Sequence, residues 1–150
     1  GEFNHGYTYS GHPVASAVAL ENLRILEEEH VLGHVRDVAM PALHEMWHGL
    51  ADHPLVGETT ITGMMGSLAL TPHKDSRAKF AMDAGTAGFM CRERCFANNL
   101  GMRHVYDRMV SSPPLVITPD EIAELGRRAR TALDQCYAQL KDGDMLKPAA

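Results

Sequence analysis

The stretch MRHVYDRMVSSPPLVITPDEI, residues 102–122, holds two local patterns that together decide the fold class. Two short extended runs, 102–105 and 108–111, are separated by Tyr106-Asp107, which is the spacing of a β-hairpin. Thr118, Pro119 and Glu121 then stand at the N-cap, first and third positions of a helix, which is a capping box. The stretch therefore predicts a hairpin that leads directly into a helix.

In the rest of the chain, hydrophobic periodicity predicts three more helices, over about 14–29, 34–51 and 86–98. It also predicts a long strand over 58–70. We expect Gly33 to end the helical conformation between the first two helices. The first half of the first helix is apolar on all sides, so we expect it to be buried. The fold class is α+β, a small, largely antiparallel sheet packed by helices. Three sets of residues are expected to face the core. They are Val35, Val38, Ala42, Met46 and Leu50 in the second helix, Phe89, Cys91 or Arg92, Cys95 and Phe96 in the third, and Ile122, Leu125, Ala129, Leu133, Cys136 and Leu140 in the last.

Bulk properties narrow the class of protein. With 150 residues, 45% of them hydrophobic, the chain suits one globular domain. A net charge of -5 gives no reason to expect nucleic acid or an anionic membrane as a partner. The longest apolar runs are too short to span a bilayer, and no signal peptide is visible at the start. The three cysteines indicate a reducing cytoplasm rather than a disulfide framework, and Cys91 and Cys95, four residues apart, favour a buried helix face over a metal site.

The pentapeptide His44-Glu45-Met46-Trp47-His48 matches HExxH, in which two histidines on one helix face hold zinc and the glutamate polarises water. A catalytic zinc site needs a third protein ligand. The extended motif would require Gly and His where Ala51 and Pro54 stand, and His53 lies just past the helix end. We therefore predict no metal here and a solvent-facing histidine pair, and keep an HExxH zinc hydrolase as an alternative function.

Eleven residues near the start, HGYTYSGHPVA at 5–15, match almost consecutively a stretch of the class III aminotransferases, the omega-transaminase group. Among members of that family, those acting on putrescine and other polyamines with pyruvate look most similar. The chain thus resembles the C-terminal small domain of a fold-type I transferase that depends on pyridoxal phosphate. The resemblance continues in order through ALENLRI (19–25), LADHPLVGE (50–58), NNLGMR (98–103) and DRMVSSPPLVI (107–117).

The resemblance implies transfer of an amino group between an amine, such as a polyamine or omega-amino acid, and a keto acid such as pyruvate. The cofactor would be pyridoxal 5'-phosphate, held by a lysine as a Schiff base. Because the family places that lysine upstream of the HGYTYSGHP loop, we expect no catalytic residue in this chain and no activity from this fragment alone. A non-catalytic, free-standing domain is the remaining alternative.

The resemblance also implies an organisation and a set of partners. Residues 1–12 would be a cofactor-proximal loop at the end of the large domain, and residues 13–150 the C-terminal small domain. The implied partners are the large cofactor-binding domain of the same enzyme, a second copy in a homodimer, and the small-molecule amine and keto acid. Neither nucleic acid nor a membrane is expected as a partner, and the expected location is cytoplasmic.

Three site residues follow from the resemblance. The residues that match Tyr7 and Thr8 reach the cofactor phosphate of the other subunit, and a hydroxyl with main-chain amides before a helix suits a phosphate. Arg103 matches the arginine that binds the substrate carboxylate and swings away for amines without one. The family has Gly where this chain has Tyr106, in a turn that favours positive φ. We therefore expect either a rebuilt turn or a strained Tyr106.

Overall fold

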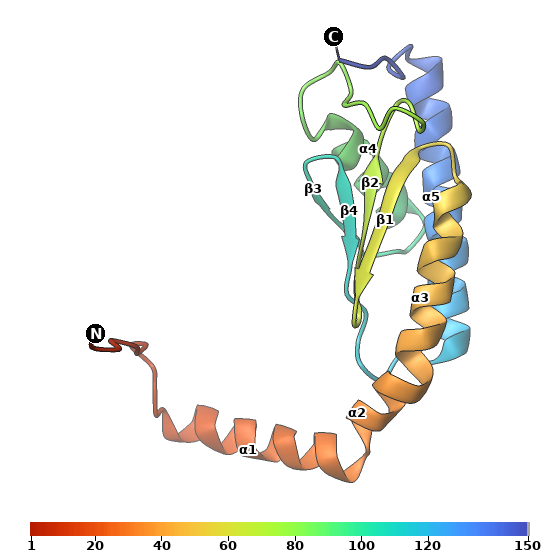
Figure 1. Ribbon diagram of the computed structural model, residues 1–150. Helices are drawn as coiled ribbons and strands as arrows, with labels where there is room; N and C mark the ends of the chain where they lie inside the picture. The colour runs from red at the N-terminus through yellow and green to blue at the C-terminus, as the bar shows by residue number, and fades with distance from the viewer. Residues whose placement is uncertain (150) are drawn as a thin grey trace.

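The computed structural model describes residues 1–149. The helical part at the start comprises α1 (Pro13–Glu28), α2 (Val31–His34), a π-helical segment (Val35–Ala39), α3 (Met40–Gly49) and a 3-10 turn (Leu50–Asp52). The strands and remaining helices follow in the order β1 (Val56–Thr62), β2 (Met65–Leu70), α4 (Thr86–Ala97), β3 (Arg103–Val105), β4 (Arg108–Ser111) and α5 (Pro119–Asp142) (Figure 1).

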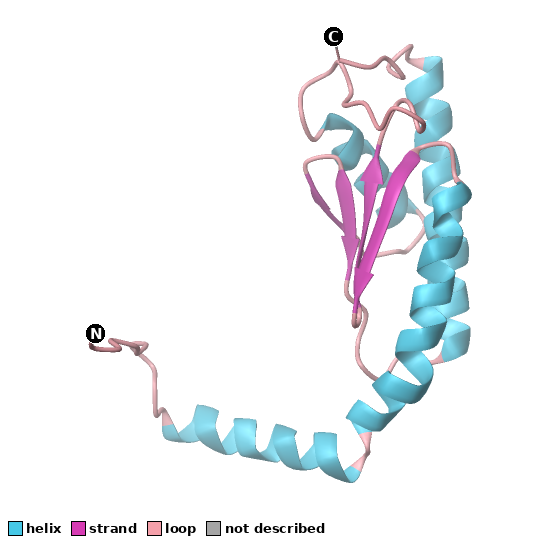
Figure 2. Ribbon diagram, viewed as in Figure 1, coloured by secondary structure: helices cyan, strands magenta, loops and turns pink. Residues whose placement is uncertain are grey.

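The four strands form one sheet in the order β1-β2-β4-β3, and every neighbouring pair is antiparallel. Helices α3 and α4 pack on one face of this sheet, and α5 packs against both helices (Figure 2). The opposite face of the sheet is not covered by the described residues. The predicted α+β class is therefore confirmed. In the described chain, no helix combines the length and apolar character needed to cross a bilayer.

The single long strand predicted over 58–70 is wrong, because the chain turns back within it. Gly63 has φ +56°, a left-handed conformation that glycine adopts without strain, and the turn that it makes separates β1 from β2. Gly66 allows a close approach between β2 and α3, because a Cβ there would lie 2.5 Å from the Trp47 indole. Trp47 thereby packs against β2 and is fully buried.

The second predicted helix is present, but its buried side differs from the prediction. The break before it falls at His30, which has φ +51°, and not at Gly33, which lies inside α2. The π-helical segment adds a residue to one turn, so the residues that follow are rotated around the axis. Val38 is 40% exposed, and the fully buried residues are Ala39, Leu43, Trp47 and Leu50, of which Leu50 was predicted. The predicted Val35, Ala42 and Met46 are partly buried against the core.

The core between α4 and α5 follows the predicted faces only in part. All six predicted core residues of α5 are buried, whereas on α4 Phe89 and Phe96 are half exposed. Cys91, Cys95 and Cys136 are buried free thiols, as the helix spacing predicts for the first two. Hydrogen bonds with Cys136 and Cys95, together with burial, raise the pKa of the Cys91 thiol. A thiol held protonated in this way is a poor nucleophile, so Cys91 acts as part of the core.

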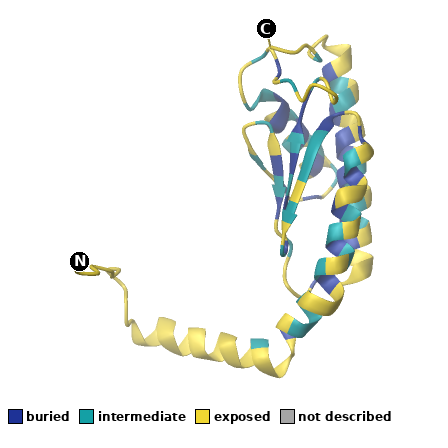
Figure 3. Cartoon of the chain, viewed as in Figure 1, coloured by how far each residue is buried: buried dark blue, intermediate teal, exposed yellow. Residues whose placement is uncertain are grey.

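Helix α1 departs most from expectation, because none of its residues is buried. The apolar side chains of its first half were predicted to be buried, yet Val14, Val18 and Leu20 are each at least 64% exposed. Figure 3 shows the helix projecting away from the sheet and its helices, coloured almost entirely as exposed. Within the described chain, α1 contacts α2, the next element, at its C-terminal end and is otherwise left open, so a surface that covers its apolar side chains must come from outside these residues.

Candidate functional site

Arg103 begins β3, the edge strand of the sheet, and lies on the uncovered face. It stands opposite Val110 of β4, which in turn stands opposite Ser67 of β2, and directly opposed residues in a sheet share a face. Arg103 is exposed, and no ion pair or hydrogen bond within residues 1–149 involves its guanidinium. An arginine presented in this way is free to receive an anion from outside the chain.

An open depression of about 620 Å³ lies beside Arg103. Its floor is apolar, and Leu100, Ile117 and Leu125 contribute to it. Of the charged residues that border it, Glu121 belongs to the capping box of α5, and Arg128 is bonded to the carbonyl of Asn99 and to Glu124. Arg103 is thus the cation at this depression without a protein partner among the described residues.

The turn that carries Arg103 is rebuilt relative to a two-residue type I′ turn. Tyr106 has φ +49°, but Asp107 does not have positive φ. The Asp107 carboxylate accepts hydrogen bonds from the backbone N–H groups of Gly85 (3.1 Å) and Gly88 (3.0 Å) at the start of α4. This contact between Asp107 and α4 was not predicted from the sequence. One feature of the sequence could have suggested it: Gly85, the N-cap residue of α4, has no side chain with which to cap its own helix, so the cap must come from elsewhere.

The N-terminal loop places Tyr7 and Thr8 just before α1. The carbonyl of Tyr7 accepts from the N–H of Ser10, and the N–H of Tyr7 donates to the Ser10 hydroxyl, so the loop is a closed turn. His12 caps α1 by accepting from the N–H of Ala15. Within residues 1–149, neither the hydroxyl nor the N–H of Thr8 has a hydrogen-bond partner. A free hydroxyl and a free amide next to a helix N-terminus fit a phosphate group.

The described chain does not bring the predicted residues into one site. Tyr7 and Thr8 lie before α1, at the opposite end of that helix from the sheet, whereas Arg103 lies within the sheet (Figure 1). A single small molecule cannot touch both groups of one chain in this arrangement.

The histidines of the HExxH pentapeptide each bond to the first hairpin. His44 Nε2 lies 2.9 Å from the Gly63 carbonyl oxygen, so this nitrogen carries the proton and donates. His48 Nδ1 lies 3.3 Å from the Thr59 hydroxyl, and the two imidazole rings meet edge to face at 6.4 Å. His44 is half-buried against the turn, and not fully solvent-facing as predicted. No group of three or more metal-ligating side chains occurs within the described part of the chain.

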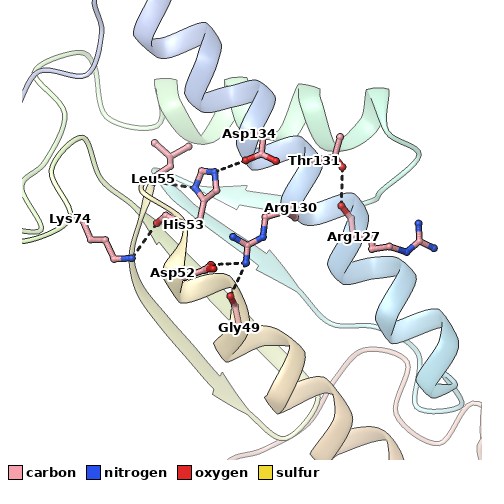
Figure 4. Close-up of polar contacts among 9 residues, drawn as sticks. All are labelled: Gly49, Asp52, His53, Leu55, Lys74, Arg127, Arg130, Thr131 and Asp134. Carbon is pink, nitrogen blue, oxygen red and sulfur yellow. Dashed lines mark hydrogen bonds and ion pairs between the residues drawn. The ribbon is translucent and has the colours of Figure 1, made fainter.

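A second polar cluster, unrecognised in the sequence, joins the end of α3 to α5 (Figure 4). His53 is only 3% exposed. Its Nδ1 accepts from the N–H of Leu55 (3.1 Å), which leaves the proton on Nε2 to donate to Asp134 (3.2 Å). Arg130 joins the same elements by binding Asp52 and the carbonyl of Gly49. Burial lowers the pKa of His53, against the opposing effect of the Asp134 charge, so the imidazole stays neutral.

Comparison with known proteins identifies aminotransferases as relatives of this chain. The sequence model of the class-III aminotransferase family matches residues 1–133. The chain is 54% identical, over 138 residues, to a putrescine–pyruvate aminotransferase of Pseudomonas aeruginosa, covering 92% of this chain and 30% of that protein. It is 37% identical, over 125 residues, to a mitochondrial gamma-aminobutyrate transaminase of Oryza sativa, covering 83% of this chain and 24% of the relative.

Solved structures show the same relationship. The omega transaminase from Pseudomonas jessenii, solved in complex with PMP, superimposes with a TM-score of 0.82 at 35% identity, over 93% of this chain and 30% of that one. A transaminase solved with L-alanine gives a TM-score of 0.82 at 31% identity, over 91% of this chain and 32% of its own. The chain thus spans only about a third or less of the length of these relatives.

Proposed function

Since the chain belongs to the class III aminotransferases, we propose that it is the C-terminal small domain of an enzyme that moves an amino group between an amine and a keto acid such as pyruvate. The similarity to a putrescine–pyruvate aminotransferase supports a polyamine or an omega-amino acid as the amine donor. The observation that carries the proposal is Arg103, whose guanidinium has no partner among residues 1–149 and lies on the open sheet face beside a depression with an apolar floor.

Pyridoxal 5'-phosphate is the cofactor that we propose for the complete enzyme, where it would withdraw electrons from the substrate carbon that loses its proton. Tyr7 and Thr8 would hold its phosphate. The free hydroxyl and free N–H of Thr8 support this role, since both can donate to a phosphate oxygen. Because these residues lie far from Arg103 of the same chain, they would serve the active site of the partner in a homodimer.

Arg103 would bind the substrate carboxylate. A guanidinium offers two parallel N–H donors to a carboxylate and keeps its charge at every physiological pH. With no protein acceptor holding it among the described residues, the side chain can move aside for an amine that lacks a carboxylate. One arginine can then serve both the keto acid and the amine.

The remaining parts of the proposal concern organisation. Residues 1–12 would close the large cofactor-binding domain, and residues 13–150 would form the small domain. The full exposure of α1 supports docking against that large domain, because an apolar helix surface of this kind is normally covered. The free state of all three cysteines supports a cytoplasmic location.

The test is the Arg103→Ala variant of the full-length enzyme, with each half-reaction measured separately. A charge-assisted hydrogen bond contributes about 1.5–3 kcal/mol, so we expect kcat/KM for pyruvate to fall roughly ten- to a hundredfold. Amines without a carboxylate should react almost as before. Arg103→Lys should recover only part of the loss, because an ammonium lacks the bidentate geometry.

Two outcomes would contradict the proposal. An equal loss in both half-reactions would mean that Arg103 supports the fold or the cofactor rather than the carboxylate. A change within about 0.5 kcal/mol for every substrate would mean that Arg103 is an ordinary surface residue.

A further inference from the structure

The strand that presents Arg103 is held weakly by the sheet itself. β3 has three residues and pairs only with β4, through Arg103, His104 and Val105. Its other edge is unpaired within the described chain. A three-residue edge strand with one neighbour has few hydrogen bonds to fix its direction, so contacts outside the sheet must contribute to the orientation of Arg103.

Those contacts converge on Asp107, in the turn between β3 and β4. Its two carboxylate oxygens accept from the N–H groups of Gly85 and Gly88, and its carbonyl accepts from the N–H of Leu70 at the end of β2 (2.8 Å). Asp107 therefore joins the turn to α4 and to β2 at once. A carboxylate at a helix N-terminus also interacts favourably with the helix dipole.

The approach of the turn to α4 is unusually close. A Cβ on Gly88 would lie 1.9 Å from the carbonyl oxygen of Tyr106, and a Cβ on Gly85 would lie 3.3 Å from the Tyr106 Cα. The turn residue Tyr106 keeps φ +49° in this contact, a conformation uncommon for a residue other than glycine. The ring of Phe89, one residue beyond Gly88, meets the ring of His104 edge to face at 6.1 Å. The hairpin is thus seated on the first turn of α4.

We propose that Asp107 is a positioning residue for Arg103, acting by clamping the β3–β4 turn to the N-terminus of α4. The inference rests on the substrate role proposed for Arg103. Asp107 does not reach the substrate itself, because its carboxylate is turned toward α4 and both of its oxygens are engaged there. Loss of the two Asp107 hydrogen bonds lets β3 shift relative to α4, and this shift changes the direction of the Arg103 guanidinium.

The test compares substrates rather than stability alone. In the full-length enzyme, Asp107→Ala should raise KM for pyruvate roughly tenfold, since small displacements of a binding group are costly, and should leave kcat/KM for an amine without a carboxylate almost unchanged. For Asp107→Asn, which keeps one acceptor oxygen, we expect a KM for pyruvate between those of the wild type and of Asp107→Ala. This variant provides the test if Asp107→Ala does not fold. Gly88→Ala should produce the same split by pushing the Tyr106 carbonyl away.

Gln139→Ala is the matched control. Gln139 on α5 accepts two hydrogen bonds from Arg94 near the other end of α4, so its loss loosens α4 without touching the hairpin. We expect this variant to leave the ratio between the two substrates unchanged.

The outcomes separate the inference from the function on which it rests. If Arg103→Ala discriminates between substrates but neither Asp107 variant does, the positioning role is wrong and the proposed function stands. Equal losses on both substrates in the Asp107 variants would also overturn it, because they would indicate a purely structural role. If Arg103→Ala itself fails to discriminate, the function and the inference fall together.

Discussion

At the scale of single residues, His53 shows how a buried polar group can be fully satisfied. Both ring nitrogens have partners, and the tautomer follows from them: Nδ1 must accept from the Leu55 N–H, so Nε2 carries the proton toward Asp134. A second proton would have to sit on Nδ1, where it would face another donor. The neutral ring is therefore the form that the folded state stabilises.

This arrangement predicts an acid sensitivity. Because the folded-state pKa of His53 is lowered, the unfolded chain binds more protons as the pH falls below about 6.5, and stability decreases from there down through the folded-state pKa. One such group contributes at most about 1.4 kcal/mol per pH unit. Denaturant unfolding between pH 8 and roughly 5 should show this slope, and His53→Gln should lose it.

His48→Gln provides the comparison for that experiment. His48 is exposed and makes one long contact with the Thr59 hydroxyl. Its replacement should leave the pH slope as in the wild type. If the two histidine variants had the same slope, another group would be responsible for the acid sensitivity.

At the scale of elements, α5 is the helix whose start is defined most completely by local contacts. The Thr118 hydroxyl accepts from the N–H of Glu121 (3.3 Å), and the Glu121 carboxylate accepts from the N–H of Thr118 (2.8 Å), which is the predicted capping box. The six residues predicted to face the core are buried over the length of the helix. The local capping contacts and the tertiary packing therefore both favour a helix that begins after Thr118.

Thr118→Ala should therefore destabilise the chain by about 1 kcal/mol, the usual effect of losing an N-cap hydroxyl. Thr118→Ser keeps the hydroxyl and should restore most of the loss. Thr131→Ala is the matched control in the same helix, because its hydroxyl only donates back to the carbonyl of Arg127, and alanine is the better helix former. A lower denaturation midpoint for Thr131→Ala than for Thr118→Ala would contradict the importance of the cap.

At the scale of the whole molecule, the described chain has a packed sheet-and-helix body and an arm that projects from it and contacts only the adjacent α2 to any extent. The arm, α1 and the loop before it, exposes a run of apolar side chains and the free donors of Thr8. All four lysines, at positions 74, 79, 141 and 147, are exposed. None is enclosed in the kind of apolar pocket that surrounds a nucleophilic lysine.

We therefore expect the chain by itself neither to form a stable covalent link with pyridoxal phosphate nor to transaminate. Incubation with the cofactor, reduction with borohydride and peptide mapping should give only scattered, substoichiometric labelling of the lysines. Stoichiometric labelling of one lysine would contradict this expectation. The control is a full-length homologous enzyme treated in the same way, which should be labelled at a single position.

The sequence by itself determined the features that depend on neighbouring residues. The capping box at Thr118 and the β3–β4 hairpin both arise from contacts within a few positions. The family resemblance rests on ordered motifs of the same kind, and the family match over residues 1–133 confirms it. The predicted roles of Tyr7, Thr8 and Arg103 remain predictions.

Tertiary structure alone decided the features that depend on residues distant in sequence. Whether Val38 or Ala39 faces the core depends on the π-helical segment, which turns the helix to place Trp47 on Gly66. The cap of α4 comes from Asp107, about twenty positions away, and no periodicity within α4 can indicate it. The exposure of α1 has the same physical reason: a hydrophobic pattern specifies that a surface be covered, but the surface that covers it is set by other parts of the folded protein.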